Sequence, residues 1–329
     1  MDQALYRTVP GRLKDPDFQR FNALPITPPR PVGDSRLRYG PTHFSGAENI
    51  PRRPFAQAGL MPAPGTWVGT PWYHCTEFFR YFSHGRQITL ETQAGQDSHG
   101  FDQNDGQIQV EWGFKKRWAA DVTLGFTSAA TRSFSKTPDL VTNTSGRSDT
   151  VFGIRYEAAR ESEDHSGYMP DIVLRAGGGY AGSHDKEYQF APGSGSVGIE
   201  PSVVALKRFG WEGFGAYSHP GYRYMRSGGH DQWFAAIGAQ QEIGRWTLNL
   251  GYRHFANTAG VDIGGAPPNI TDSRQIMETA EQLEGGFGYR DRDGRLYQFY
   301  LRKTIDGNNT SGALVFGVYT SFAFGSEKH

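Results

Sequence analysis

Residues 105–126, DGQIQVEWGFKKRWAADVTLGF, contain the pattern that decides the fold. In residues 107–114 every second side chain is apolar and those between are polar or small, which is typical of a strand with one apolar and one polar face. A basic turn, Lys115-Lys116-Arg117, follows, and the same alternation resumes from Trp118 to Phe126. These residues predict an antiparallel hairpin.

The apolar face of this hairpin requires either the core of a soluble sandwich or the lipid around a closed barrel. Charged residues such as Glu111 and Asp121 on the opposite face suit a wet barrel interior. Aromatic side chains gather at the turn, where an aromatic girdle would meet the lipid headgroups. The turn is short and charged, and the same pattern recurs down the chain. These features favour lipid.

The composition is compatible with a barrel and excludes several other classes. The 329 residues include 43 glycines and one cysteine, with 34 basic and 34 acidic residues. A neutral chain argues against a nucleic-acid partner, and a single cysteine excludes an internal disulfide and paired-cysteine metal sites. No run of about eighteen apolar residues is available for a transmembrane helix. We expect no cofactor, no metal site and no catalytic residues.

The pattern after residue 83 predicts an all-β fold, a closed antiparallel transmembrane β-barrel of about twelve strands in the bacterial outer membrane. We assign residues 83–325 to the barrel and 326–329 to a tail, with the first strand at 86–95 and a single strand at 211–223. One set of connections is mostly short. The other set is longer and includes 129–148 and 305–310, as expected for periplasmic turns and outer loops.

Residues 1–82 differ in composition from the remainder. Twelve of the nineteen prolines precede residue 72, so this segment is predicted to be an extended, Pro-rich arm or plug without regular central strands. Its aromatic residues suggest packing inside the barrel or against a partner protein, and from residue 66 it is aromatic enough to be interfacial. The N-terminus has no secretory signal pattern, and we interpret the numbering as beginning at or near a mature terminus.

Strand alternation also predicts which side chains face the lumen and which meet the membrane interface. The predicted lumen lining has mixed charge, which favours ion pairs across a narrow lumen over a filter for one ion class; it consists of Glu91, Glu111, Asp121, Arg155, Asp171, Arg175, Asn249, Arg253, Glu284, Arg290 and Arg302. The predicted interface aromatics are Trp112, Phe114, Trp118, Trp211, Trp246, Phe322 and Phe324.

Three blocks of the sequence resemble a known family. VEWGFKKRWAADVTLGF, the block at 148–182 and QWFAAIGAQQEIGRWTLNLGYRHF are similar to strand-turn-strand units of the phenol-degradation (meta-pathway) outer-membrane transporters, over about residues 105–255. The family is taken as outer-membrane barrels proposed to pass small, often hydrophobic molecules. The resemblance implies the same fold. Ser148-Asp149 stands where Gly-Asp is expected, and residues 1–82 have no counterpart.

Three functional hypotheses follow from these patterns. The first is a barrel, in contact with the lipid of the outer membrane, that passes a small molecule passively across it, with hydrophobic molecules among the candidate solutes. The alternative is an anchoring barrel whose N-terminal arm binds a partner protein. The third is an enzyme related to lipid A deacylases, because YRHFANTAG (252–260) resembles their His-x-Ser-Asn, but Ala256 stands at the serine position and leaves no nucleophile. We therefore predict that the protein is not an enzyme.

Overall fold

The computed structural model describes residues 61–83, 86–89, 97–134, 140–161, 168–183, 197–209, 213–226, 229–260, 277–292 and 295–324. No helix among these residues is long and apolar enough to cross a membrane. They contain fifteen strands: β1 (Trp67–Ser83), β2 (Arg86–Thr89), β3 (Asp97–Lys115), β4 (Trp118–Phe134), β5 (Leu140–Arg147), β6 (Thr150–Ala159), β7 (Asp171–Tyr180), β8 (Gly198–Arg208), β9 (Phe214–Ser218), β10 (Gly221–Met225), β11 (Gln232–Ile243), β12 (Trp246–Asn257), β13 (Thr279–Arg290), β14 (Leu296–Asn308) and β15 (Thr310–Phe324).

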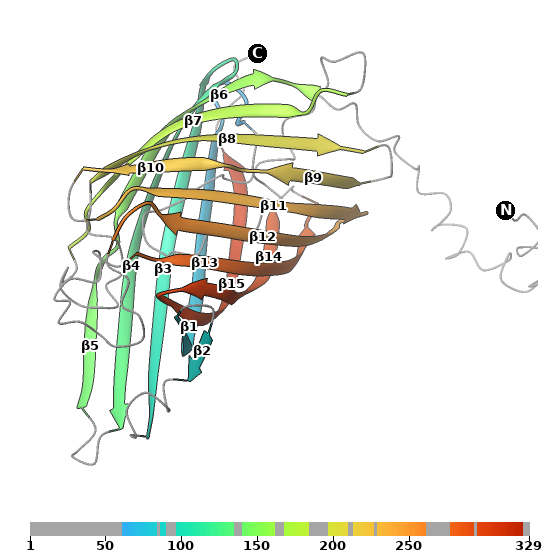
Figure 1. The fold of residues 1–329 in the computed structure, drawn as a ribbon. Coiled ribbons are helices and arrows are strands. Elements are labelled where there is room, and N and C mark those ends of the chain that lie inside the picture. The colour runs from blue at the N-terminus through green and yellow to red at the C-terminus, as the bar shows by residue number, and fades with distance from the viewer. Residues whose placement is uncertain are drawn as a thin grey trace, which may run out of the picture. The chain divides into compact units, whose positions relative to one another are not determined.

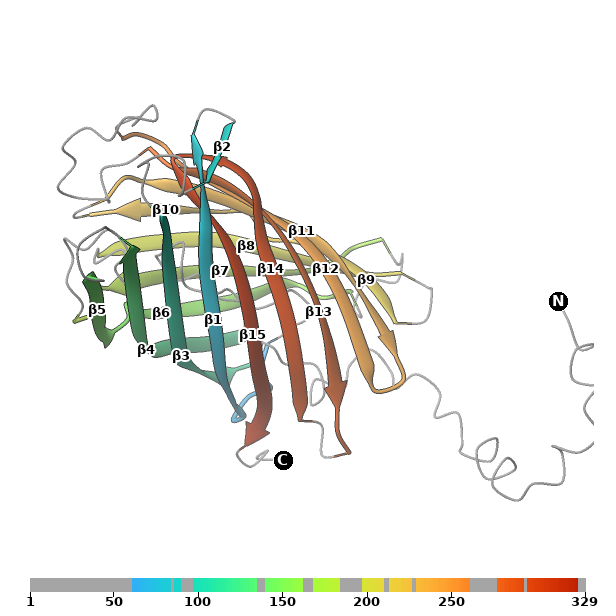
Figure 2. The same cartoon turned by 90° about the horizontal axis from the view of Figure 1, so that it is seen from below.

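The sheet closes on itself. Neighbouring strands are antiparallel, β1 pairs with β15 on one side and β3 on the other, and β9 and β10 together join β8 to β11. Figure 2 shows β1 between β3 and β15, where the first and last strands of the barrel meet. The closed antiparallel barrel of 12 strands is therefore confirmed, with β2 and β5 as two extra strands.

Side chains alternate between the two faces of the wall as the sequence predicts. In β6, for example, Val151 and Arg155 are buried while Phe152 and Ile154 are each 52% exposed. The exposed face is apolar on nearly every strand, whereas the buried face carries most of the charged groups. This is the reverse of a soluble sandwich, and it is what a lipid-facing wall around a polar interior requires.

The first barrel strand corrects the predicted boundary of the N-terminal segment. Residues 67–82, assigned to the arm, belong to β1. Of the expected strand at 86–95, the structure describes residues 86–89, which form β2 and pair with β1. The alternation in β1 is hard to detect because aromatic residues lie on both of its faces: Trp72 is buried, and Tyr73 is 48% exposed. Residues 1–60 lie outside the described part of the chain.

The expected single strand at 211–223 is interrupted. β9 ends at Ser218 and β10 begins at Gly221, because Pro220 has no N–H to donate to the ladder. Hydrogen bonding nevertheless continues on both sides. The Val203 N–H donates to the Pro220 carbonyl at 3.0 Å, and His219 and Ala236 exchange bonds of 2.7 and 3.1 Å. The wall remains closed at the interruption.

The two ends of the barrel differ, although not in every connection as predicted. The turn from β3 to β4 is tight, with Arg117 at φ 65°, and Gly244 at φ 61° closes the turn from β11 to β12. At the opposite end, the expected loop 129–148 contains the end of β4 and all of β5, which pair with each other, and the start of β3 extends alongside β4 (Figure 1). The expected loop 305–310 is a tight turn through Asn309 at φ 53°.

Candidate functional site

A continuous chain of charged side chains lies on the inner face of the barrel. We call it the ion-pair belt. Its members lie on six neighbouring strands and are almost fully buried. They are Glu111 (β3), Asp121 (β4), Arg155 (β6), Arg175 (β7), Glu200 (β8) and Arg223 (β10).

Each arginine of the belt contacts acidic groups from other strands. Arg155 lies 3.0 Å from Glu111 and 3.3 Å from Asp121. Arg175 lies 3.1 Å from Asp121 through Nη2 and 3.2 Å from Glu200 through Nη1. Three acids and three arginines give the belt zero formal charge, which reduces the cost of burying it.

The belt continues toward the β11–β12 side through amides. Arg223 donates to Glu200 Oε2 at 2.6 and 2.9 Å and to Gln232 Oε1 at 2.6 Å. The Gln232 side-chain amide then donates to Asn257 Oδ1 at 3.1 Å. One connected polar network therefore extends from β3 to β12 around the inner wall.

Strand register explains why these groups reach diagonally. Glu111 is directly opposite Asp121, and Arg155 is directly opposite Arg175. Each of these four side chains therefore faces one of like charge on the neighbouring strand. The arginines therefore reach past their direct neighbours to acids on other strands. Glycines make this possible for Arg175: a Cβ on Gly153 or Gly177 would come within 2.6 or 2.2 Å of its guanidinium.

A second buried ion-pair group lies on the other side of the barrel. Glu284 on β13 lies 3.1 Å from Arg253 on β12 and 3.0 Å from Arg302 on β14. Two arginines share one carboxylate, and all three side chains are nearly inaccessible to solvent. The group therefore carries one net positive charge.

A third polar cluster joins β1, β3 and β4. Asp105 Oδ2 lies 2.5 Å from His74 Nε2 and accepts a 2.9 Å hydrogen bond from the Gln103 amide. The Thr127 hydroxyl donates to the other oxygen of the same carboxylate. All four side chains are fully buried. The sequence analysis did not predict His74, Gln103 or Thr127 as lumen residues, although strand parity marks them as inward.

Apolar side chains of the described residues also form three buried clusters, and the two larger ones lie on different sides of the barrel. The first joins β4, β7, β8, β9, β11, β12 and β13 and includes Leu206, Tyr217, Phe234 and Phe255. The second joins β1, β14 and β15 through Trp72, Leu296, Tyr300, Val315 and Tyr319. Both clusters are built from aromatic rings and aliphatic chains. The inner wall is therefore charged in some sectors and apolar in others.

The residues just before β1 lie against the inner wall. Met61 is buried within the first apolar cluster. Gly65 N–H donates to the Gly113 carbonyl at 2.6 Å, and Gly113 N–H donates to the Thr66 carbonyl at 3.0 Å. Gly113 belongs to the inward-facing positions of β3, and a Cβ there would come within 2.3 Å of the Ala63 carbonyl oxygen. Residues 61–66 therefore line the interior at the short-turn end.

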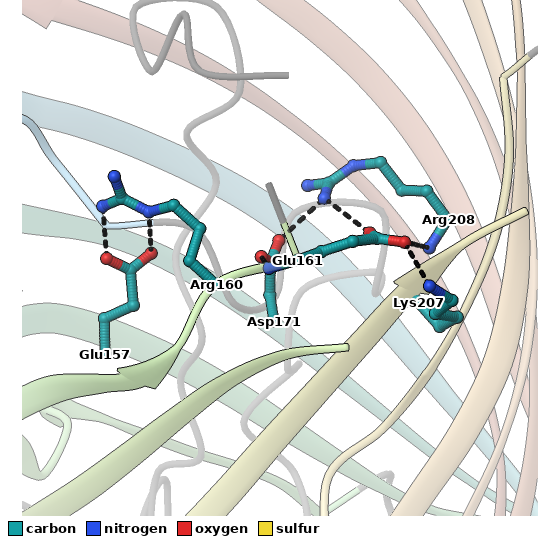
Figure 3. A network of polar contacts seen from close by, with 6 residues as sticks. All are labelled: Glu157, Arg160, Glu161, Asp171, Lys207 and Arg208. Atoms are coloured by element: carbon teal, nitrogen blue, oxygen red, sulfur yellow. Dashed lines mark hydrogen bonds and ion pairs between the residues drawn. The ribbon is translucent and has the colours of Figure 1, made fainter. Parts of the chain in front are cut away.

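A further polar network ties the β6–β7 turn to the end of β8 (Figure 3). Glu161 accepts hydrogen bonds from Lys207 Nζ at 2.7 Å and from the Arg208 guanidinium at 3.2 Å. Arg208 also donates to Asp171 at 2.7 Å. Glu157, near the end of β6, pairs with Arg160 at the start of the turn. The network fixes the turn at the short-turn end of the barrel.

The structure places most of the predicted lumen residues in these networks. Glu111, Asp121, Arg155 and Arg175 meet in the belt, and Arg253, Glu284 and Arg302 form the second group. Two others are buried elsewhere: Asp171 in the turn network and Asn249 on β12. Arg290 is half-buried at the end of β13, and Glu91 lies outside the described residues.

Sequence reasoning missed Glu200 and Arg223, which complete the belt. Both have inward parity, but each lies close to a residue that interrupts the strand pattern, Pro201 and Pro220 respectively. The partners of Arg175 on β8 were therefore not predicted. Whether any of these side chains contacts a solute stays a prediction.

An aromatic cluster lies at the short-turn end on the outer face. Trp112 stacks on Trp67 with ring centroids 5.3 Å apart, and Trp118 lies 4.8 Å from Tyr156. Phe114 lies between Trp112 and Trp118, and two further pairs are Trp246 with Tyr289 and Phe322 with Phe324. Phe322 is half-buried, the other predicted members are exposed, and Trp211 lies outside the described residues. Their depth in the membrane stays a prediction.

In the region that resembles a deacylase motif, His254 and Ala256 face outward. The ring of His254 packs against Trp233 at a tilt of 31° with centroids 4.5 Å apart, and His254 lies 3.9 Å from Glu281. Ala256, at the serine position, is directly opposite Trp233 in the ladder. The hydroxyl of Thr258 donates to the Asp231 carbonyl at 3.1 Å. The side chains on this part of β12 therefore supply no positioned nucleophile.

Comparison with known proteins supports the fold and goes no further. No family model and no curated protein matches the chain. Among solved structures, the chain is similar to an outer membrane channel from Pseudomonas putida F1, with a TM-score of 0.60 and 10% identity over 79% of this chain and 96% of that one. The resemblance predicted from residues 105–255 is thus confirmed at the level of the fold.

Two more distant structures share the barrel architecture. They are the translocator domain of the autotransporter NalP from Neisseria meningitidis, with a TM-score of 0.46 and 11% identity over 80% of this chain and 89% of that one, and the P. putida toluene transporter TodX, with a TM-score of 0.40 and 9% identity over 83% and 94%. Neither likeness is close enough to argue from. The chain is a bacterial outer-membrane β-barrel.

Proposed function

We propose that this barrel is a passive channel for small, uncharged and largely apolar molecules. The proposal is carried by one observation: the inward charges lie in ion-pair networks against the wall, the largest of them neutral, while two aromatic and aliphatic clusters face the interior between them. A wall of this kind offers apolar contact to a solute and no unbalanced single-sign ring to select an ion. Because the identity to known channels is low, the solute class is inferred from the side chains of the inner wall alone.

We further propose that the segment before β1 restricts passage. Met61 lies in the first apolar cluster, and the backbone of residues 63–66 is bound to Gly113 on the inner wall. A chain held there occupies space at the short-turn mouth. The hydrogen bonds of Gly65 and Thr66 with Gly113 on β3 support the proposed role of the Pro-rich segment as a plug.

Reversal potentials across a planar bilayer test the channel proposal. We expect the purified full chain to discriminate only weakly between potassium and chloride, because the ion-pair belt has no formal charge and the Arg253–Glu284–Arg302 group adds a single positive charge. Arg175→Met removes one cation from between Asp121 and Glu200 and should shift the reversal potential toward cation selectivity. Lys303→Met, on the outer face, is the matched control and should leave it unchanged.

The solute class is tested in the same bilayers. A neutral aromatic alcohol should reduce the channel current at millimolar concentration, and replacing Phe234 with Ser in the apolar cluster should weaken this block. Strong ion selectivity of the wild-type protein, or block by charged sugars alone, would contradict the proposal. Absence of any conductance, with and without residues 1–65, would remove the channel function altogether.

A further inference from the structure

The tight turn between β3 and β4 carries three consecutive basic residues. Lys115 and Lys116 are exposed, and Arg117 is half-buried at φ 65°. In the part of the chain that the structure describes, no carboxylate lies within ion-pair distance of Lys115 or Lys116. Both ammonium groups are therefore accessible to an external anion.

The neighbouring side chains at this end of the barrel do not cancel the charge of the turn. Six basic and three acidic side chains lie along the described rim from the β3–β4 turn to the end of β8; they are Lys115, Lys116, Arg117, Arg160, Lys207 and Arg208 against Glu157, Glu161 and Asp171. Each of the three acids already pairs with a basic side chain from the β6–β7 turn or the end of β8 (Figure 3). The described rim therefore has a net charge of three, all of it supplied by the β3–β4 turn.

Aromatic rings form a continuous row beside this turn, on the outer face of β1, β3, β4 and β6. The row consists of Trp67, Trp112, Phe114, Trp118 and Tyr156, with successive ring centroids 5.3, 5.5, 6.4 and 4.8 Å apart. The first four of these side chains are exposed. Aromatic rings of this kind are typical of the membrane–water interface. A lipid that packs along the row would have its headgroup at the level of the basic turn.

The β11–β12 turn, at the same end of the barrel, provides a comparison. It also lies beside an aromatic pair on the outer face, Trp246 with Tyr289 at 5.0 Å. Its charges cancel, because Glu242 and Arg245 are both exposed and opposite in sign. This turn therefore has the rings without the net charge.

We propose that the Lys115-Lys116-Arg117 turn and the aromatic row beside it form a docking site for an anionic phospholipid of the periplasmic leaflet. The inference rests on the predicted periplasmic position of the short turns. The ammonium groups bind the phosphate oxygens through charge-assisted hydrogen bonds, and the rings pack against the glycerol and the upper acyl chains. A phospholipid matches both parts of the site, because the rings continue from the turn onto the apolar wall.

Quenching of tryptophan fluorescence by brominated lipid tests the proposal on the full chain in vesicles of phosphatidylcholine. A minor fraction of the lipid carries brominated acyl chains, either as phosphatidylglycerol or as phosphatidylcholine. Bromine quenches the tryptophans that it contacts, so phosphatidylglycerol should quench more strongly. We expect a preference of about fivefold or more, the gain from one or more basic residues at an anionic headgroup. Replacing both Lys115 and Lys116 with Gln should remove this preference.

Two matched pairs of variants localise the site. Lys116→Gln should lower the preference for phosphatidylglycerol, whereas Arg245→Gln, which removes one charge from the β11–β12 turn, should leave it unchanged. Trp118→Phe should reduce the excess quenching, because it deletes a reporter beside the basic turn, and Trp246→Phe should not. Heat-modifiable migration on gels verifies that each variant is folded, and the exposed lysines provide the test if Trp118→Phe fails to fold.

Equal quenching by the two brominated lipids would overturn the proposal. So would equal losses in Lys116→Gln and Arg245→Gln, because the lipid would then respond to the overall charge of the rim. If inorganic phosphate abolishes the preference at an ionic strength where chloride does not, the turn binds free phosphate and the lipid site is contradicted. None of these results depends on conductance, so the site can fail while the channel proposal stands.

Discussion

Arg175 illustrates how single residues make a buried charge network possible. Its guanidinium lies over Gly153 and Gly177 and reaches Asp121 and Glu200 on either side. A buried arginine is tolerated only where acids and hydrogen-bond acceptors satisfy its donors, because removal from water costs several kcal/mol per ion. Because neither glycine has a side chain, the planar guanidinium of Arg175 has room to lie against the wall.

Gly177→Ala should therefore weaken the barrel through Arg175. The added Cβ would lie 2.2 Å from the guanidinium and displace it from its acids. We expect the free energy of unfolding to fall by about 1–3 kcal/mol, the cost of leaving buried polar groups unsatisfied. Urea unfolding in lipid vesicles measures this.

Gly106→Ala is the matched control, because a Cβ at Gly106 on β3 meets no atom within 4 Å. Its effect should stay within about 0.5 kcal/mol. Equal losses at the two positions would show that alanine affects the strands generally, and that Arg175 has no special need for the space.

At the scale of elements, the strands with a clean contrast between faces were predicted best. The β3–β4 hairpin matches the expected strands 106–115 and 118–128 in pairing, with Gln109 opposite Thr123. β1 was not predicted, because Trp72 and His74 face inward while Tyr73 faces lipid, so hydropathy does not alternate. β9 and β10 were predicted as one strand, because Pro220 interrupts the backbone hydrogen bonding locally but does not change the direction of the chain.

The β4 strand allows a direct measurement of the membrane's position. Leu124 is 46% exposed on the outer face, and it lies six residues from Trp118, roughly 15 Å along the membrane normal. Leu124→Arg should cost about 2–4 kcal/mol in a lipid folding assay. Ser128→Arg, four residues further on the same exposed face, should cost less than about 1 kcal/mol. Similar losses at both positions would place the strand at a different depth.

The β6–β7 turn should depend on Glu161 for its attachment to β8. Glu161→Gln removes the ion pairs to Lys207 and Arg208, with a stability loss below about 1 kcal/mol because the partners are partly exposed. The rate at which an amine-reactive reagent acylates Lys207 should rise, because the Lys207 ammonium group loses its ion pair with Glu161. Glu157→Gln is the control, since its partner Arg160 lies in the same turn. An unchanged rate in Glu161→Gln would show that the turn is held by other contacts.

At the scale of the whole molecule, sequence parity identifies which side chains face inward but not which of them meet. Glu111 and Arg155 are brought within 3.0 Å by strands that do not pair with each other, β3 and β6, which both flank β4. Such contacts depend on the register of each hairpin and on closure of the sheet. The candidate site was therefore predicted as a set of residues, while the belt, its neutrality and the apolar clusters required the fold.

The boundary at β1 determines how the N-terminal segment should be tested. A protein shortened to begin near residue 83 would lack β1 and lose its pairing with both β3 and β15. Beginning at Thr66 keeps every barrel strand, so the hydrogen bonds that close the wall are preserved. This shortened chain also lacks Met61 and the bond from Gly65 to Gly113.

We expect the chain that begins at Thr66 to fold as a heat-modifiable barrel and to conduct more than the full chain, because the segment along the inner wall is gone. Gly113→Ala in the full chain should raise conductance as well, since its Cβ would lie 2.3 Å from the Ala63 carbonyl and push residues 61–66 off β3. Gly106→Ala, on the outer face of the same strand, should leave conductance unchanged. If neither truncation nor Gly113→Ala alters conductance, the segment does not obstruct the lumen. Loss of a co-purifying protein on truncation would then favour the anchoring barrel, in which the Pro-rich arm binds a partner.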